Sequence, residues 1–281
     1  MNKNKENNAF DKIIPALAER YGKYISLYDK CFVIKSVEKR IRENNLNSPE
    51  SYLKFIFENS NEAQKFLNSL NITYSEFFRN PLTFSLLRQI IFPLILCEKE
   101  KSGNNNIRIW STGCSAGQEV YSIAIILDEL LSDKDKDYKY HIFATDTNEA
   151  FIELAKRGSY DFQEVKNTSL NHIIKYFTKD KDRYNIICKF KENINFSVYD
   201  LLDENTSCPP ESIYGNFDMI ICCNLLFYYK SSIQKAIINK IKECLQVGGF
   251  FVTGEAEKSI VEKVSCFSPV SYTDSIFKKI K

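Results

Sequence analysis

The chain of 281 residues contains only two histidines, His141 and His172, and its nine cysteines include no C-x-x-C pair. Zinc sites use cysteine and histidine ligands at short spacings, so the sequence predicts no metal site. An odd number of cysteines in a long chain, with a polar start (MNKNKENNAF) in place of an apolar leader, does not fit a secreted disulfide framework. We therefore expect reduced cysteines and a cytoplasmic protein.

Long apolar runs and an excess of one charge are also missing. The longest apolar candidate, residues 90–97, is broken by Pro93 and followed by four charged residues, whereas a membrane-spanning helix needs about 20 apolar residues. The 38 basic and 36 acidic residues give a formal net charge of +2, without the basic excess that is typical of nucleic-acid-binding proteins. We expect no stable membrane insertion and no nucleic-acid partner. Hydrophobic residues make up 44% of the chain, which is enough for a large core.

Residues 1–70 predict a small all-α domain. Apolar residues recur at three- and four-residue intervals over 13–21 and 32–41, as in amphipathic helices. Ser48-Pro49-Glu50 predicts a helix start, with Ser as the N-cap and Pro at the first helical position. The second amphipathic stretch also carries a predicted basic face, which includes Lys35, Lys39, Arg40 and Arg42.

From residue 71 onward, strand-like and helix-like patterns alternate. Such alternation implies parallel pairing, so residues 71–281 predict an α/β, Rossmann-like domain with a doubly wound, mostly parallel sheet. The segment 158–193 interrupts the alternation and predicts an inserted β-subdomain. The last long helix is expected to end at Gly248-Gly249. The expected strands are 107–110, 140–144, 195–199, 217–222 and 250–253, and the expected helices are 84–96, 120–131, 148–156 and 231–245.

A loop with two glycines, Gly113 and Gly117, follows the first expected strand. It is neither G-x-G-x-x-G nor a P-loop, so it is not suited to a triphosphate. Polar residues end later strands at Asp146, Asp200 and Asn224. Ligands of doubly wound sheets bind beyond the carboxyl ends of the strands, where an acid can accept from ribose hydroxyls and a polar side chain can contact an adenine edge. The pattern therefore favours a nucleoside-binding site.

Several segments together resemble the chemotaxis-receptor glutamate methyltransferases, the CheR family. They occur in the family's order and spacing, and KSVEKRIR extends the resemblance into the helical N-terminal domain. The combination of SAGQEVYS with a later ATD is specific to this family among methyltransferases. The segments are NITYSEFFRNPLTF, IRIWSTGCSAGQEVYSIAI, IFATDTNEAFIELAKRGSY, NFSVYDLL, FDMIICCNLLFYY and VGGFFVTGEAEK.

The resemblance implies S-adenosylmethionine as the cofactor, S-adenosylhomocysteine as the product, and the cytoplasmic domain of a methyl-accepting chemoreceptor as the partner of a monomeric enzyme. It also implies that the basic face of the N-terminal domain docks on an acidic receptor helix. For the amino-acid end of the cofactor, the resemblance implies that Glu119 holds the ammonium and that Arg79, with Ser75 and Thr73, holds the carboxylate. For the nucleoside end, it implies Gly113 in the loop, Asp146 at the ribose, and Asp200 and the Leu201 backbone at the adenine, with Cys223 and Asn224 beside them. Tyr228 would face the transferred methyl group, so Tyr228 and Arg79 are the expected catalytic residues.

Two positions depart from the family pattern. Cys223 stands where the family usually has Arg, which removes a fixed charge near the cofactor or substrate carboxylate. Asp200 stands where the family often has Asn, a change that other methyltransferases also show. The first departure leaves two further hypotheses open: a catalytically weakened cofactor-binding sensor or adaptor, and a methyltransferase of the same fold with a different substrate.

Structural roles are the alternatives for each candidate residue. Glu119 could stabilise a helix N-terminus, Asp146 could cap the helix that follows it, and Arg79 could form a surface ion pair. Tyr228 could be a core tyrosine, and Cys223 could be buried packing. The basic face of the N-terminal domain could simply be solvated.

Overall fold

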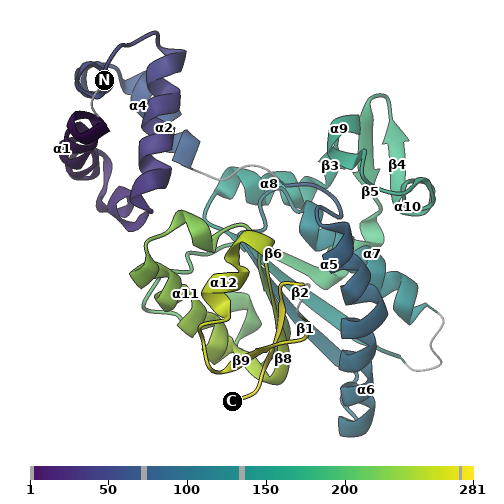
Figure 1. The fold of residues 1–281 in the computed structure, drawn as a ribbon. Helices are drawn as coiled ribbons and strands as arrows, with labels where there is room; N and C mark the ends of the chain where they lie inside the picture. Colours follow the sequence, from purple (N-terminus) through teal and green to yellow (C-terminus); the bar gives the residue numbers. More distant parts are fainter. Residues whose placement is uncertain (1–2, 71–74, 133–136, 272–273) are drawn as a thin grey trace. The chain divides into compact units, whose positions relative to one another are not determined.

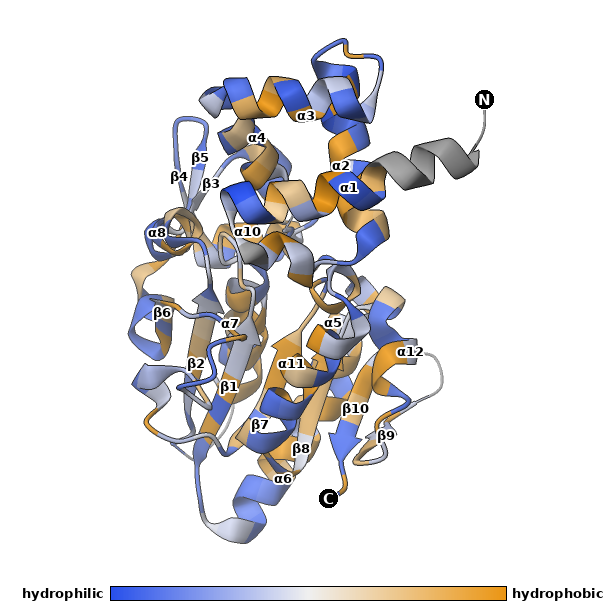
Figure 2. Ribbon diagram, turned by 90° about the vertical axis from the view of Figure 1, so that its left-hand side faces the viewer, coloured by the Kyte–Doolittle hydropathy of each residue, from blue (hydrophilic) through white to orange (hydrophobic). Residues whose placement is uncertain are grey.

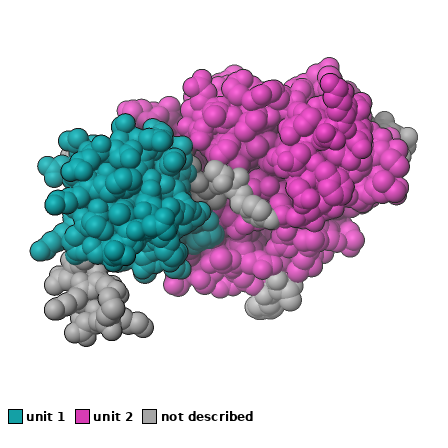
Figure 3. Space-filling model, turned by 90° about the horizontal axis from the view of Figure 1, so that it is seen from above, with its two compact units in different colours: residues 1–73, 225–235 teal, residues 74–224, 236–281 magenta. Residues whose placement is uncertain are grey.

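The computed structural model describes residues 3–70, 75–132, 137–271 and 274–281, with only the backbone for residues 3–9 and Lys23. The contacts divide the chain into two compact units (Figure 3). The first unit holds residues 1–73 and 225–235, and the second holds residues 74–224 and 236–281. The predicted position Thr73 lies outside the described residues.

The first unit is helical. Two of its helices begin at capped residues: Asp29 Oδ1 accepts from Cys31 N at 2.8 Å, and Ser48 and Ser51 form a reciprocal capping box. The predicted helix start at Ser48-Pro49 is therefore confirmed. A core of buried apolar side chains, including Tyr52 and Phe66, holds the helices together. The helices are α1 (Lys3–Tyr21), a 3₁₀ turn (Lys23–Leu27), α2 (Lys30–Glu43), α3 (Pro49–Glu58) and α4 (Ser60–Leu70).

A segment from late in the chain completes this unit. Residues 225–235 contain the 3₁₀ turn Leu226–Tyr228 and the start of α11 (Ser231–Cys244). The Tyr228 carbonyl accepts from Asp29 N at 2.7 Å, and Lys230 N donates to the Leu27 carbonyl at 3.0 Å. The loop that carries Tyr228 is thus fixed by backbone hydrogen bonds to the start of α2.

The second unit is built on a seven-stranded sheet in the order β6-β2-β1-β7-β8-β10-β9, of which the first five strands are parallel (Figure 1). Chain order reverses between β1 and β7, which makes their carboxyl ends the topological switch point where such folds bind ligands. The predicted doubly wound sheet is confirmed. The strands are β1 (Asn106–Thr112), β2 (Lys139–Asp146), β6 (Ile194–Val198), β7 (Phe217–Cys222), β8 (Leu245–Thr253), β9 (Phe267–Pro269) and β10 (Ile276–Lys279).

Both faces of the sheet are buried, because neighbouring residues along each strand point to opposite sides. Ile109 belongs to the core under α5, α6 and α7, while its neighbour Trp110 points the other way and packs near Phe217 and Tyr199. Apolar residues make up most of β7 and the later part of β8, as the orange colour in Figure 2 shows. The covering helices include α7 (Gln118–Leu131), α8 (Glu149–Arg157), α12 (Lys258–Val261) and the later part of α11.

The helix before β1 is continuous from residue 81 to 102, as α5 (Pro81–Leu86), a π turn (Leu87–Ile91) and α6 (Phe92–Ser102). In the π turn, Phe92 N donates to the Leu87 carbonyl five residues earlier, directly before Pro93, which has no N–H to donate. This is the one helix among the described residues that is long and apolar enough to cross a membrane. Core helices of soluble proteins pass the same test, and this helix buries Ile91, Phe92 and Ile95 in the core.

An antiparallel sheet of three strands, in the order β3-β5-β4, forms the inserted subdomain and confirms that prediction. Residues 188–193, where β-like runs were expected to continue, form a 3₁₀ helix instead. The elements are β3 (Ser159–Tyr160), α9 (Phe162–Val165), α10 (Leu170–Tyr176), β4 (Phe177–Asp180) and β5 (Arg183–Ile186).

The expected helix stop at Gly248-Gly249 is wrong. The helix ends at Cys244, and both glycines lie inside β8. Gly248 has φ 84°, and a Cβ on Gly249 would lie 3.0 Å from the Asp218 carbonyl oxygen. The glycines therefore serve an irregular stretch of the β7–β8 pairing, where the register shifts between Phe217 and Met219.

A buried ion pair ties the helix to the sheet, and it gives a stability prediction. Lys99 Nζ lies 2.8 Å from Asp218 Oδ1, with side chains 9% and 1% exposed. We expect Lys99→Met to lower the free energy of unfolding by about 3–5 kcal/mol, because it leaves a buried carboxylate without its cation. Urea unfolding measures the change.

Lys101→Met is the matched control, two residues along the same helix. Its partner is Glu98 at 2.7 Å, and both side chains are about two-thirds exposed (65% and 67%). The urea midpoint of this variant should stay at the wild-type value. Equal effects of the two substitutions would show that the Lys99–Asp218 pair is not a structural tie.

Candidate functional site

The loop after β1 is held to the end of β2 by its own backbone. Cys114 N donates to the Thr145 carbonyl at 2.9 Å, and Ser115 N donates to Asp146 Oδ2 at 2.9 Å. Three loop residues have positive φ: Gly113 at 65°, Ser115 at 49° and Gly117 at 89°. The loop therefore turns sharply from β1 into α7 at the switch point.

Gly113 and Gly117 have different structural roles in this loop. A Cβ on Gly117 would lie 3.0 Å from the Ala155 Cβ, so this glycine permits the close approach of α7 and α8. Gly113 is exposed beside the carboxyl end of β1. Gly117 is buried, so of the two glycines Gly113 alone is open to solvent, although it is not among the residues that line the pocket beyond β1, β7 and β8.

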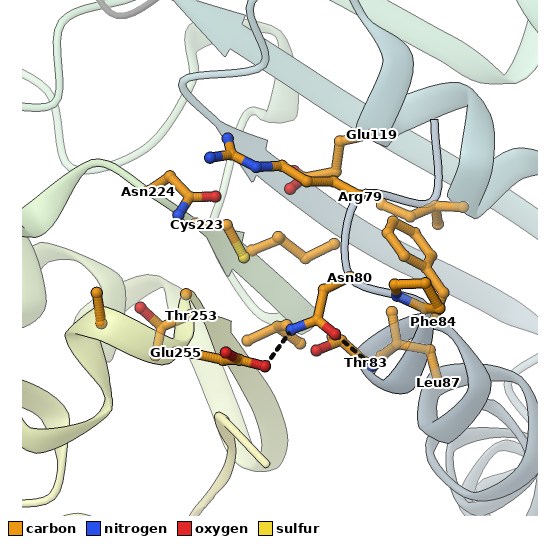
Figure 4. A pocket seen from close by; sticks show the side chains of 16 residues that line it. Arg79, Asn80, Thr83, Phe84, Leu87, Glu119, Cys223, Asn224, Thr253 and Glu255 are labelled. Atoms are coloured by element: carbon orange, nitrogen blue, oxygen red, sulfur yellow. Dashed lines mark hydrogen bonds between the residues drawn. The ribbon is translucent and has the colours of Figure 1, made fainter. Parts of the chain in front are cut away.

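A pocket of about 410 Å³ opens beyond the carboxyl ends of β1, β7 and β8 (Figure 4). It brings together four predicted site residues, Arg79, Glu119, Cys223 and Asn224. Its volume is within the range of small-molecule sites. The other lining residues are Asn80, Pro81, Thr83, Phe84, Leu87, Ile123, Ile221, Val252, Thr253, Gly254, Glu255 and Ala256.

Glu119 projects from the first turn of α7 into this pocket. Its Oε1 accepts from Ser111 Oγ at 2.8 Å, and Figure 4 shows the Arg79 side chain beside it. Burial raises the pKa of Glu119 to about 7, although Ser111, Arg79 and Cys223 oppose the rise. The carboxyl group is therefore held where a further cation would stabilise its charged form.

Cys223 and Asn224 follow β7 directly. The Cys223 thiol is hydrogen-bonded to Glu119, and burial together with the charge of Glu119 raises the pKa of this thiol well above its usual value. Cys223 is thus a neutral group in the pocket wall. Asn224 has a left-handed backbone, φ 59°, and its N–H donates to Glu257 Oε2 at 2.8 Å.

Glu257 is a site residue that the sequence pattern did not single out. Its fully buried carboxylate oxygen Oε2 accepts from Asn224 N at 2.8 Å, Gly254 N at 2.8 Å and Thr253 Oγ1 at 3.0 Å. A Cβ on Gly254 would lie 2.8 Å from the same oxygen. Glu257 therefore joins the turns after β7 and β8, and it lies in the TGEAEK segment, where nothing local distinguishes it from Glu255.

Asn80 is the second residue that the pattern missed. Its Nδ2 donates to Glu255 Oε1 at 2.9 Å, and its Oδ1 accepts from Thr83 N at 3.4 Å as the cap of α5 (Figure 4). This contact links the segment after Arg79 to the turn after β8. The pocket thus has a polar bridge between two of its walls.

Asp146 lies beside the loop and outside the pocket lining. Its Oδ1 accepts from Asn148 N at 2.9 Å, and burial raises its pKa. The cap of α8 is Asn148, whose side chain accepts from Ala150 N at 3.0 Å, so Asp146 does not cap that helix. The backbone N–H groups of Ser115, Thr147 and Asn148 all hydrogen-bond to the Asp146 carboxylate, which leaves about one of its four lone pairs for a ribose hydroxyl.

Asp200 and Leu201 lie on the same edge of the sheet. Tyr199 N donates to the Asp146 carbonyl at 3.0 Å, which places the end of β6 beside the end of β2. Asp200 is exposed and its Oδ1 accepts from Leu202 N at 2.8 Å, while Leu201 is buried. Ser75, which precedes Arg79, is half-buried.

Tyr228 belongs to the first unit. Its ring lies edge-on to Phe32 of α2 with 4.7 Å between centroids and 4.0 Å from the Phe227 ring. The expected catalytic tyrosine thus sits in a loop that the helical unit fixes in place.

The predicted basic face of α2 needs a correction. Lys35, Lys39 and Arg42 are exposed. Arg40 is not part of that surface, because its side chain is only 12% exposed, its Nε donates to Glu62 Oε1 at 2.7 Å, and its other nitrogens pair with Glu62 and Glu43. Arg40 is a structural residue that ties α2 to α4.

Two family descriptions match the chain: "CheR methyltransferase, SAM binding domain" over residues 73–276 and "CheR methyltransferase, all-alpha domain" over residues 8–70. The chain is also similar to chemotaxis protein methyltransferases of Borreliella burgdorferi (24% identical, 92% of this chain, 90% of that protein) and Salmonella typhimurium (27% identical, 88% and 83%). A solved structure with similarity is magnesium protoporphyrin IX methyltransferase from Synechocystis with bound SAM (TM-score 0.35, 14% identity, 69% of this chain, 79% of that chain).

The residues present fit S-adenosylmethionine. Its amino-acid end is a zwitterion, which needs an acceptor for the ammonium and a donor for the carboxylate. Glu119 and Arg79 offer this pair within one pocket, and the raised pKa of Glu119 marks a carboxyl group that an ammonium would stabilise. Asp146 and Asp200 lie outside the pocket lining, at the carboxyl ends of β2 and β6 on the same edge of the sheet.

The raised pKa of Glu119 gives a prediction about pH. A ligand ammonium favours the ionised carboxylate, so protonation of Glu119 competes with binding. With a pKa of about 7, S-adenosylhomocysteine should bind about eightfold more weakly at about pH 6 than at about pH 7.5. Isothermal titration calorimetry across this range measures the slope.

Glu119→Gln should weaken binding by about tenfold or more at neutral pH and abolish the slope. Glu149→Gln is the matched control, since Glu149 is an exposed acid in the first turn of α8. A wild-type affinity that does not change over this pH range would refute the assigned role of Glu119.

Proposed function

Because the chain belongs to the CheR methyltransferase family and is an S-adenosylmethionine-dependent methyltransferase, we propose that it methylates glutamate side chains of chemoreceptor cytoplasmic helices. The glutamate methyl esters would serve chemotactic adaptation in the cytoplasm. The observation that carries the proposal is the match of both family descriptions, which together span residues 8–70 and 73–276. The named relatives are chemotaxis protein methyltransferases over most of their length.

The chemistry of this reaction suits the pocket. A glutamate side chain has an ordinary pKa of about 4.3, so it is ionised at neutral pH and needs no general base. None of the described residues that line the pocket is a histidine. The bound cofactor supplies a methyl group on a positively charged sulfur. The protein has to align the carboxylate with that group and keep water out, since opposite charges cancel as the bond forms.

Each residue has a proposed role in this alignment. Glu119 and Arg79 hold the two ends of the cofactor's amino acid, and a neutral Cys223 leaves the incoming carboxylate unpaired and nucleophilic. Tyr228 donates one hydrogen bond to that carboxylate. Further proposed contacts are Thr73 and Ser75 for the cofactor carboxylate, Gly113 for close backbone approach, Asp146 for the ribose, and Asp200, Leu201 and Asn224 for the adenine.

The exposed basic residues of α2 are the proposed docking surface for an acidic receptor helix. Lys35, Lys39 and Arg42 are spaced by four and three residues, so they share one face of the helix. Rim charges of this kind act mainly on encounter rate and salt dependence. Arg40 takes no part in this proposal.

The test is transfer of tritium from labelled S-adenosylmethionine to receptor-containing membranes of the same organism. We expect label on receptor bands that is released by alkali, because esters hydrolyse in base. Lys39→Glu should lower the initial rate at limiting receptor and leave the affinity for S-adenosylhomocysteine unchanged. Alkali-stable label, or label on small molecules only, would sink the proposal in favour of a different substrate.

A second candidate function is a cofactor-binding sensor or adaptor with weak turnover. It is favoured by Cys223, a neutral thiol whose pKa both Glu119 and Glu257 raise, at a position where the family usually has Arg. The positive charge of Arg79 lowers the pKa of Glu119, whereas the nearby charge of Glu257 raises it. An adaptor would retain cofactor affinity while receptor methylation stays slow.

Restoring the charge separates the two candidates. If the missing cation limits turnover, Cys223→Arg should raise the methylation rate by about tenfold, on the scale of one charge-assisted hydrogen bond. Cys223→Met is the control for volume without charge and should not raise the rate. A wild-type rate in the Cys223→Arg protein, with cofactor affinity intact, counts against Cys223 as a defect.

A further inference from the structure

The three residues before Arg79 all contact the inserted subdomain. Glu76 Oε2 accepts from Asn167 Nδ2 at 2.9 Å. The Phe77 ring lies edge-on to Tyr160 and Phe177, with centroids 4.9 Å and 5.4 Å away. The Phe78 ring stacks on His172 of α10 at 5.1 Å with an interplanar angle of 24°. The inserted subdomain therefore packs against residues 76–78, which lead directly to Arg79.

His172 is itself held by α7 and by the cap of its own helix, α10. Its Nε2 lies 3.2 Å from Glu129 Oε1 of α7, and Glu129 Oε2 lies 3.2 Å from Arg88 of the π turn. Its backbone N–H donates to Ser169 Oγ, the cap of α10, at 3.2 Å. The imidazole ring is thus fixed in position by α7 and by its own helix α10, and its face stacks on the Phe78 ring.

Phe78 needs such support because its backbone is unusual. Its φ is 51°, in the left-handed region that a bulky residue enters only under constraint. Its N–H donates to Ser122 Oγ at 3.0 Å, and its ring packs edge-on against Phe84 at 5.3 Å. Together with His172, these contacts fix the turn from which Arg79 leaves toward Glu119.

We propose that His172 is a positioning residue for the cofactor site: by stacking on Phe78 it holds the strained turn that aims Arg79 at the carboxylate of the cofactor's amino-acid end. The proposal rests on the role of Arg79 given above. It makes the inserted subdomain part of the cofactor site. It also means that a displacement of α10 changes affinity for the amino-acid end of the ligand while the nucleoside end keeps its contacts at Asp146 and Asp200.

The test compares two ligands that differ at the amino-acid end. S-adenosylhomocysteine carries the amino acid, and 5′-methylthioadenosine lacks it. In His172→Ala, calorimetry should show S-adenosylhomocysteine binding about tenfold more weakly, with 5′-methylthioadenosine within about twofold of wild type. Retained binding of the second ligand also shows that the variant is folded. Unchanged affinity for S-adenosylhomocysteine, or an equal loss for both ligands, would overturn the proposal.

Two further variants sharpen the result. His172→Phe keeps a flat ring against Phe78 and should retain wild-type affinity for S-adenosylhomocysteine within about threefold, since stacking is the contact invoked. His141→Ala removes the chain's other histidine, which is exposed on β2, and should change neither affinity. A loss in His141→Ala equal to that in His172→Ala would also contradict the proposal.

Arg79→Ala separates this inference from the site assignment beneath it. If Arg79→Ala leaves the ratio of the two affinities unchanged, the assigned role of Arg79 fails. If Arg79→Ala changes the ratio and His172→Ala does not, the positioning proposal alone fails. The double variant should bind no more weakly than Arg79→Ala, because both substitutions remove the same interaction.

Discussion

Glu119 lies at the topological switch point of the sheet with its carboxylate turned into the pocket, and burial raises its pKa to about 7. Three neighbouring side chains stabilise the charged form of this carboxyl group. Ser111 donates to it, Cys223 contacts it as a neutral thiol, and Arg79 brings a positive charge from a separate segment. A cationic ligand end relieves the remaining cost of the buried charge. The loop after β1 and helix α7 position Glu119, and the turn at Phe78 positions Arg79.

The neighbouring carboxylate, Glu257, contrasts with Glu119. It accepts three hydrogen bonds from the turns after β7 and β8, and those donors fix Asn224 and Gly254. Glu119 accepts from the Ser111 hydroxyl and the Cys223 thiol, and its side chain otherwise faces the pocket. The two acids thus have different roles, because their hydrogen-bond partners differ: Glu257 holds the turns together, and Glu119 faces the pocket.

Parts of this structure could be predicted from local pattern. The alternation of apolar runs located β1, β2, β6, β7 and the last four residues of β8, since a buried parallel strand is apolar along much of its length. Arg40 shows what a local sequence pattern does not reveal. Periodicity placed Arg40 on a basic helix, but its partner Glu62 comes from another helix, and only packing brings the two together. The same holds for Gly248-Gly249, where turn chemistry predicted a helix end and strand pairing used both glycines inside β8.

The sequence by itself determined the fold class and, through its resemblance to the CheR family, the cofactor, because periodicity and short motifs depend only on residues close together in the chain. The tertiary structure decided which of those residues share a pocket, that Gly117 is needed for helix packing, and that Glu257, Asn80 and His172 belong with the site. Each of these three acts through a partner far along the chain: Asn224, Glu255 and Phe78. Contacts of that kind depend on how the elements pack, and no spacing in the sequence encodes them.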